Sequence, residues 1–237
     1  MVNLFIILQS KGGVGKSAYT YNLANMAVQA GVDALFLCMD NETKTSEKQL
    51  GFVSCDSYDL IDTKSKQIDR TKLDAFFEEM STQQNYEYVF CDMGATSSEQ
   101  FHKYIDSEDG AEILTSLKEL GINLNIHCII GGDNVYPACA DFAEGLFENT
   151  QGVAENVIVL NNKFDYNDGQ MHDIRQLSQK YQAKITDFNI INEAGTRGIS
   201  LVHKLMEEGK AAILEAPVLT RKRYEISLRK MQFDFEI

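Results

Sequence analysis

A glycine-rich segment near the start of the chain, residues 8–17, constrains the fold more than any other stretch. It reads Leu-Gln-Ser-Lys-Gly-Gly-Val-Gly-Lys-Ser. The apolar run at residues 4–8 predicts a buried strand before it, and residues 18–31 predict a helix that ends at a glycine. Backbone N–H groups and the positive end of a helix dipole converge at such a junction. The segment therefore predicts a cradle for phosphate groups.

Two side chains of this segment add charge and metal chemistry to the cradle. Lys16 is the residue type that contacts β- and γ-phosphates, and the Ser17 hydroxyl is a ligand type for Mg²⁺. The ordinary phosphate-binding loop opens with glycine, whereas here Ser10 stands at that position and a second lysine, Lys11, follows it. A glycine-rich turn without a ligand is the alternative, and the flanking strand and helix argue against it.

Length and composition indicate an ordinary globular protein. The chain has 237 residues, 44% hydrophobic and 24% charged, which fits one α/β domain over residues 1–237. We find neither an apolar run long enough to span a membrane nor the pattern of a signal peptide, so we expect a cytoplasmic location. The formal net charge of −13 argues against a surface that attracts nucleic acid throughout, but leaves room for a local basic patch. Five cysteines without metal-type spacing are expected to be reduced and structural.

Apolar runs alternate with segments of helical spacing along the rest of the chain. This alternation predicts a mostly parallel, doubly wound sheet with helices on both faces. The polar stretch 41–67 is expected to be irregular. Further strands are expected at 32–40, 86–92, 122–130, 156–160 and 184–191. Helices are expected around 73–80, 98–120 with a break at 107–110, 135–147, 173–181, 198–208 and 219–231.

Two of the predicted strands end in an aspartate, Asp40 and Asp92. The carboxyl ends of parallel strands meet at the edge of the sheet where ligands bind, so both side chains are expected near the cradle. Asp92 is predicted to hold Mg²⁺, directly or through water, and Asp40 to orient the attacking water or help to hold the metal. The backbone N–H of Gly94 is expected to sense the γ-phosphate. Aspartates that merely cap turns are the alternative.

The segment Lys11-Gly-Gly-Val-Gly-Lys16-Ser17 resembles the deviant Walker A motif of the ParA/MinD group of P-loop ATPases. Asp40 then matches the second acidic motif of that group and Asp92 its Walker B aspartate, and the resemblance covers almost the whole chain. It implies ATP and Mg²⁺ as cofactors and a homodimer with nucleotide sandwiched between subunits. Lys11 would be the signature lysine that reaches the phosphates of the partner subunit, completing the charge stabilisation only when two subunits meet. Lys11, Lys16 and Asp40 are the implied catalytic residues.

The chain departs from that group at two places. Family members often carry Asp-x-Asp followed by Pro-Gln, whereas this chain has Cys38-Met-Asp-Asn-Glu, and Met93 stands where a proline usually follows Walker B. The missing carboxylate at Cys38 implies slow hydrolysis. Together with residues 92–97 and the late segment 219–223, these features look like the TraL/StbB branch of plasmid transfer and stability regions. That branch implies a switch that positions or partitions plasmid DNA or conjugative transfer machinery, with a plasmid-encoded DNA-binding or transfer protein as partner.

The end of the fifth predicted strand bears on the choice of base. Asn161 stands where the family places an asparagine that reads adenine, whereas residues 162–165 spell the Asn-Lys-x-Asp pattern of guanine-reading GTPases. ATP is favoured, because the deviant lysine is the rarer signal, and a GTP-using switch is an alternative. The expected metal ligands are Ser17, Asp40 and Asp92. The expected nucleotide-binding residues are Gly12, Gly13, Val14, Gly15, Lys16, Ser17, Ala18, Gly94, Asn161 and Asn162.

An amphipathic helix is expected at about 219–233, and the spacing places Tyr224, Leu228, Met231 and Phe235 along one helical face with basic residues nearby. Packing on the sheet is the favoured role of this helix. Contact with DNA or with a membrane surface, and hence a peripheral location at the nucleoid or membrane, is the alternative. A metabolic ligase or kinase of the same superfamily is the alternative function, and Lys11 argues against it because a single-site enzyme needs no lysine aimed at a second subunit.

Overall fold

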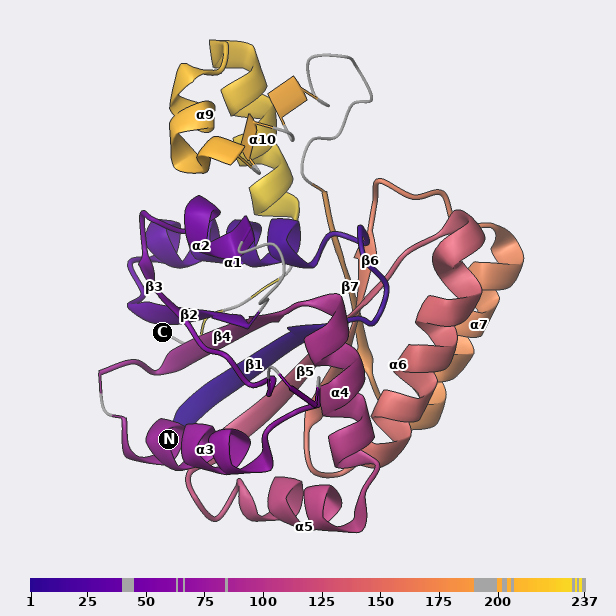
Figure 1. Cartoon of the computed structure of the whole chain (residues 1–237). Helices are drawn as coiled ribbons and strands as arrows, with labels where there is room; N and C mark the ends of the chain where they lie inside the picture. The colour runs from indigo at the N-terminus through magenta and orange to yellow at the C-terminus, as the bar shows by residue number, and fades with distance from the viewer. Residues whose placement is uncertain are drawn as a thin grey trace.

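Figure 1 shows the fold of the chain as a computed structural model. The structure describes residues 1–39, 45–62, 64–65, 67–83, 85–189, 200–201, 204–205, 207–231, 233 and 235.

Within these residues seven strands form one sheet, and every pair of neighbours runs parallel. Their order across the sheet is β3-β2-β4-β1-β5-β6-β7. The strands are β1 (Val2–Leu8), β2 (Ala34–Met39), β3 (Ser54–Ser57), β4 (Tyr88–Met93), β5 (Ile122–Ile130), β6 (Glu155–Asn161) and β7 (Lys184–Phe188). The predicted parallel α/β sheet is confirmed.

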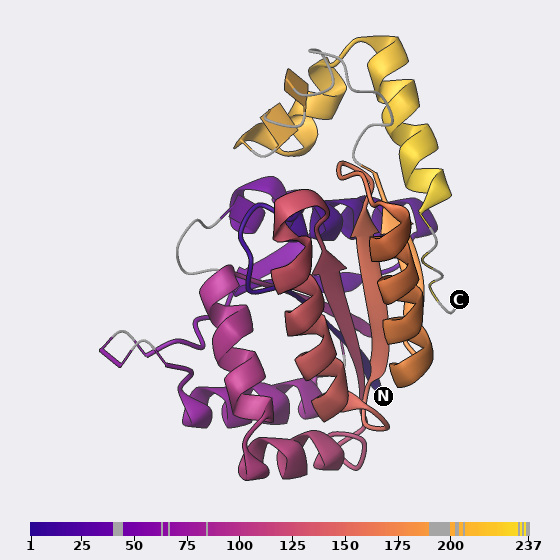
Figure 2. The same cartoon turned by 90° about the vertical axis from the view of Figure 1, so that its right-hand side faces the viewer.

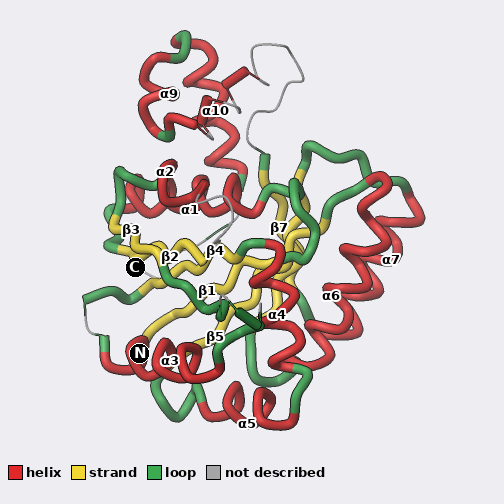
Figure 3. The backbone as a smooth tube through the Cα atoms, in the orientation of Figure 1, coloured by secondary structure: helices red, strands yellow, loops and turns green. Residues whose placement is uncertain are grey.

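Helices lie on both faces of the sheet, as a doubly wound fold requires. Figures 1 and 2 show α1, α2 and α10 on one side and α3 to α7 on the other. Figure 3, coloured by secondary structure, shows the same layers, with strands between helices. The helices are α1 (Lys16–Ala30), α2 (Thr45–Gln49), α3 (Arg70–Thr82), α4 (Ala95–Ile105), α5 (Glu108–Ser116), α6 (Tyr136–Thr150), α7 (Asp168–Tyr181), α9 (Lys210–Glu215) and α10 (Val218–Lys230).

The strand order reverses at β1, in the middle of the sheet. β4 lies on one side of β1, followed outward by β2 and β3, and β5 to β7 follow one another on the other side. Ligands of open α/β sheets bind at the carboxyl ends of the strands where the order reverses. β1 ends at Leu8, directly before the glycine-rich loop. The topology therefore puts that loop at the reversal point.

Three segments differ from the predicted elements. The stretch expected to be irregular contains two of them, the short helix α2 and the strand β3, a polar and mostly exposed edge strand without a hydrophobic pattern. The short helix α9 was also missed. The helix expected at 198–208 falls partly on residues outside the described ones. The break expected near Ser107 is present: α4 ends at Ile105, and the Ser107 hydroxyl accepts a hydrogen bond from the Gly110 backbone at 3.2 Å to start α5.

Candidate nucleotide-binding site

The loop between β1 and α1 has the backbone of a phosphate cradle. Gly13 and Gly15 have φ angles of 74° and 106°, a left-handed region that favours glycine, and α1 begins immediately afterwards at Lys16. A Cβ atom on Gly15 would lie 2.6 Å from the Asn161 side-chain nitrogen and 3.1 Å from the Phe188 ring. Glycine at this position lets the loop pack directly against the ends of β6 and β7.

Lys16 folds back into the loop and is only 8% exposed. Its ammonium donates to the backbone carbonyls of Gln9 and Lys11, at 3.0 and 3.3 Å. Buried charges need such partners, and the two carbonyl dipoles hold this cation against the start of the loop. Lys11, in contrast, is exposed. The two lysines of the motif therefore differ: one belongs to the interior of the loop and the other faces outward.

Gln9, which sequence reasoning missed, anchors the start of the loop. Its fully buried side chain donates to the carbonyls of Ile129 and Cys139, at 2.9 and 3.3 Å. Its backbone N–H donates at 3.2 Å to the hydroxyl of Ser98, which itself donates to the Gly94 carbonyl at 2.7 Å. The only signal for this role is a polar residue at the end of an otherwise apolar strand.

Asp92 lies near the end of β4, 1% exposed, in register with Ile7 of β1 and Cys38 of β2. Gly94, two residues later, is the N-terminal cap residue of α4. The structure therefore brings the Asp92 carboxylate and the start of α4 to the same sheet edge as the loop. Carboxylate and hydroxyl oxygens are donors that Mg²⁺ accepts, and Asp92 and the half-buried Ser17 supply them.

Asp40 lies outside the described residues. The residue before it, Met39, ends β2, and its carbonyl accepts a hydrogen bond of 2.8 Å from the hydroxyl of Ser97 on α4. Ser97 and Ser98 thus fix the carboxyl ends of β2 and β1 to one helix. Neither serine was predicted to do this.

Asn161 braces the loop from β6. Its side chain is 2% exposed; the amide nitrogen donates to the Val14 carbonyl at 2.7 Å, and the amide oxygen accepts from the Lys163 backbone at 3.0 Å. Asn162 is exposed and its amide donates to the Asp187 carboxylate. Both polar ends of Asn161 are therefore engaged within the chain, a role that its position in the sequence did not suggest.

Two glycines after β5 let a third loop close on the cradle. A Cβ atom on Gly131 would lie 3.2 Å from the Val14 side chain, and one on Gly132 would lie 2.8 Å from the Phe164 Cβ. The loops that follow β1, β5 and β6 are consequently packed against one another. The predicted residues Gly12, Gly13, Val14, Gly15, Lys16, Ser17, Ala18, Gly94, Asp92, Asn161 and Asn162 all lie at this carboxyl edge of the sheet.

Comparison with known proteins identifies the fold of this chain. The sequence matches no protein-family model and no curated protein significantly. Among solved structures, the MinD cell division protein of Aquifex aeolicus has a TM-score of 0.57 and 15% identity, over 97% of this chain and 95% of that one. The MinC:MinD cell division protein complex of the same organism has a TM-score of 0.56 and 14% identity, over 100% and 99% of the two chains. The chain therefore has the P-loop NTPase α/β fold of these MinD structures, and identity this low says no more than that.

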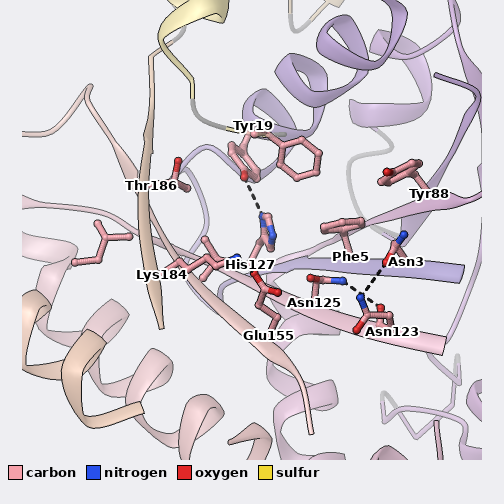
Figure 4. Close-up of a pocket in the computed structure, with 13 residues that line it drawn as sticks. Asn3, Phe5, Tyr19, Tyr88, Asn123, Asn125, His127, Glu155, Lys184 and Thr186 are labelled. Atoms are coloured by element: carbon pink, nitrogen blue, oxygen red, sulfur yellow. Dashed lines mark hydrogen bonds and ion pairs between the residues drawn. The ribbon is translucent and has the colours of Figure 1, made fainter. Parts of the chain in front are cut away.

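A second, polar cleft lies at the opposite end of the strands (Figure 4). Its volume is about 370 Å³, and its walls include Asn3 of β1 with Asn125 and His127 of β5. The hydroxyl of Tyr19 on α1 lies 2.9 Å from Nδ1 of His127. Burial, helped by the positive charge of Lys184, lowers the pKa of His127 to about 3. The ring is therefore neutral at ordinary pH and ties α1, which begins directly after the glycine-rich loop, to the middle of the sheet.

The apolar face predicted near the C-terminus is used inside the molecule. Tyr224 and Leu228 of α10 are buried, and the Tyr224 hydroxyl donates to the Asn22 side chain of α1 at 3.0 Å. Beyond the helix, the ring of Phe233 packs 5.4 Å from that of Phe5 on β1. Basic residues remain exposed along α10: Lys222, Arg223, Arg229 and Lys230. None of the helices in the described ranges is both long and apolar enough to cross a bilayer.

Proposed function

We propose that the chain is an ATP-dependent switch ATPase that dimerises around nucleotide and positions or partitions plasmid DNA or conjugative transfer machinery. One observation carries most of this proposal. A lysine ammonium is held on backbone carbonyls inside a tightly packed glycine loop, at the strand reversal point and at the same sheet edge as a buried aspartate.

The roles within one subunit follow from the donor types. Lys16 exchanges its carbonyl partners for the β- and γ-phosphates of ATP, and the N–H groups from Gly12 to Ala18 surround the phosphates. Ser17 and Asp92, with Asp40, supply oxygen ligands for Mg²⁺, and the metal neutralises charge on the phosphates. Gly94, at the start of α4, donates its backbone N–H to the γ-phosphate.

Dimerisation is proposed from Lys11, which is exposed beside the cradle instead of folded into it. An exposed cation at this place is available to the phosphates of a facing subunit. Hydrolysis then removes the γ-phosphate that holds two subunits together, which is a population shift driven by differential contacts. One matched structure contains MinD in complex with MinC. By analogy we propose a protein partner here, of the plasmid-encoded DNA-binding or transfer type, as the resemblance to the TraL/StbB branch suggests.

A GTP-using switch is the second candidate, favoured by the Asn-Lys-x-Asp sequence at 162–165. Asn162 and Asp165 are exposed on the loop that follows β6, accessible to a base. Asn161, the residue proposed to read adenine, uses both polar ends of its amide within the chain and must change partners to meet a base. We keep ATP as the proposal because the deviant lysine is the rarer sequence signal.

Contact with DNA or a membrane through α10 is also kept as a proposal. The residues available for it are the exposed apolar Val218 and Leu219 together with the basic residues of the same helix. Sedimentation with anionic vesicles and retention on DNA, comparing the wild type with Leu219→Asp and Arg223→Glu, distinguish the two surfaces. Binding to neither removes the proposal of direct contact.

Gel filtration at defined nucleotide states tests the switch itself. With ATP and Mg²⁺ we expect the wild type to dimerise, Lys16→Ala to stay monomeric and Asp40→Ala to accumulate as an ATP-bound dimer with slow hydrolysis. Lys11→Ala should bind nucleotide yet fail to hydrolyse it in a dimer. Competition of ATP and GTP for a fluorescent nucleotide analogue decides the base. Monomers for all variants in every nucleotide state contradict the proposal.

A further inference from the structure

Two cysteine sulfurs lie next to each other between the edge strand β3 and its neighbour β2. Sγ of Cys38 on β2 is 3.3 Å from Sγ of Cys55 on β3, and both thiols are reduced. Cys38 is buried, whereas Cys55 is partly exposed at the edge strand. An oxidant in solution therefore reaches one sulfur of a pair whose second member is already in van der Waals contact with it.

The strand register makes the two cysteines diagonal neighbours. Cys55 pairs with Phe36, and Cys38 pairs with Ser57, so the two cysteines are offset by two residues on one face of the sheet. Strand spacing and rise put the Cα atoms of such a pair roughly 8 Å apart. Disulfides need less than about 7 Å. Bond formation therefore requires β3 to slide along β2.

β3 can make that movement. It is four residues long, β2 is its one pairing partner among the residues that the structure describes, and its other residues, Ser54, Asp56 and Ser57, are exposed. β2, in contrast, is an interior strand whose end is fixed to α4 through Ser97. The cost of moving the edge strand is correspondingly low, because few buried contacts are lost.

We propose that Cys38 and Cys55 are an oxidation site that closes to a reversible intramolecular disulfide. Peroxide is the oxidant: it accepts two electrons from the pair, its O–O bond breaks, and the two thiol protons leave with the oxygens. Two thiols and one hydrogen peroxide thus give one disulfide and two waters. Cys55 reacts first because it is the exposed partner, forming a sulfenic acid, and Cys38 then displaces the hydroxyl group.

The disulfide is also expected to affect the candidate site, through the backbone of β2. The Cys38 carbonyl accepts the backbone N–H of Tyr58 at 3.0 Å, and Cys38 is in register with Asp92. A movement of β3 along β2 strains the hydrogen bonds at the end of β2, the strand that directly precedes Asp40. We therefore expect oxidation to weaken nucleotide binding, a consequence that rests on the proposed function while the thiol chemistry does not.

The test treats the full chain with hydrogen peroxide, blocks the remaining thiols and maps peptides by mass spectrometry. We expect a peptide pair linked through Cys38 and Cys55, its loss in Cys55→Ser, and its retention in the matched edge-strand control Ser57→Ala. Amide exchange of residues 54–58 should be faster in the oxidised protein and return to the original rate with dithiothreitol. No substitution of Cys38 is used, because Cys38 is buried in the core. Cys55→Ser, on the exposed edge strand, is sufficient to test whether the two cysteines form the disulfide.

Two results overturn the proposal: oxidation of Cys55 only to sulfinic or sulfonic acid, or disulfides that join other cysteines or other copies of the chain. Nucleotide affinity, measured on the same oxidised sample, tests the effect on the candidate site separately from the formation of the disulfide. A disulfide that leaves affinity unchanged refutes only the link to the site. A failure of the reduced protein to bind any nucleotide refutes the proposed function and leaves the disulfide standing.

Discussion

The side-chain amide of Asn161 donates a hydrogen bond of 2.7 Å to the carbonyl oxygen of Val14, across 147 residues of chain. Through this bond the end of β6 fixes the shape of the loop that follows β1. Because Gly15 lies against the same amide, the loop cannot relax without moving Asn161. Contacts within the chain itself therefore fix the shape of the loop, which lowers the ordering cost of binding a phosphate group there.

Replacing Asn161 with alanine should destabilise the fold. The Val14 carbonyl and the Lys163 N–H lose their partner, and a buried polar group left unsatisfied costs about 1–3 kcal/mol. Urea unfolding measures the loss. Asn162→Ala is the control, because its amide is exposed, and should change the free energy of unfolding by less than about 0.5 kcal/mol. Equal effects of the two substitutions contradict the bracing role.

Gly15→Ala and Gly12→Ala should behave differently, although both residues belong to one motif. At Gly15, φ is 106° and a Cβ atom meets Asn161 and Phe188, so alanine should cost roughly 2 kcal/mol or more. Gly12 has no positive φ, and no atom lies within 4 Å of the position that a Cβ atom would take there. Thermal unfolding of the two variants compares them. A Gly15→Ala protein as stable as Gly12→Ala contradicts the close packing of the loop.

Stability should fall in mild acid because of His127. Its pKa is about 3 in the folded protein, against about 6.5 when the chain is unfolded. Between these values the unfolded chain binds a proton that the folded chain does not, so folding weakens as the pH falls, and above about pH 6.5 the effect is absent. From pH 7 to pH 5 the loss is about 2 kcal/mol.

The measurement for His127 is urea unfolding at pH 7 and pH 5. His127→Gln should lose less stability between the two pH values than the wild type, whereas substitution of the exposed His172 by glutamine should leave the difference unchanged. An unaltered pH difference in His127→Gln shows that carboxylates alone cause the acid sensitivity.

Tyr224→Ala should destabilise the protein by removing the contact between α10 and α1. Its ring is 2% exposed, packs against Tyr21 and bonds Asn22, and deletion of a buried aromatic ring costs about 3–5 kcal/mol. Leu219→Ala on the same helix, at a residue 74% exposed, is the control and should cost about 0.5 kcal/mol or less. Calorimetry distinguishes the two variants. A small effect at Tyr224 means that α10 does not depend on its contact with α1.

The sequence predicted the sheet well because its central strands are apolar and its strand ends carry glycine or aspartate. The convergence of Asp92 with the loop follows from the parallel strands that this alternation predicts, whereas the order of the strands around β1 was not predicted. β3 could not be predicted in this way: an exposed edge strand of serine, cysteine and aspartate has no hydrophobic pattern. Its existence depends on backbone pairing with β2, which a one-dimensional pattern does not contain.

The polar contacts of the site were beyond sequence reasoning for a similar reason. Gln9, Ser97 and Ser98 bond carbonyl and N–H groups far away in the chain, and the local sequence does not identify those partners. Asn161 was singled out by resemblance as a base reader, and its bond to Val14 was not expected. The sequence identified the charged residues of the candidate site, but it did not predict the hydrogen bonds that position them.

The central place of β1 has a consequence for the order of events during synthesis. β1 leaves the ribosome before the other six strands of the sheet, yet its neighbours are β4 and β5, and the brace of its loop is Asn161. At about 5–20 residues per second, translation needs roughly 8–30 s to travel from the start of the loop to that brace. In the first part of this interval, before β4 and β5 have been made, the apolar strand β1 has neither of its neighbours to pair with. The loop of a nascent chain therefore lacks this brace until synthesis has passed Asn161.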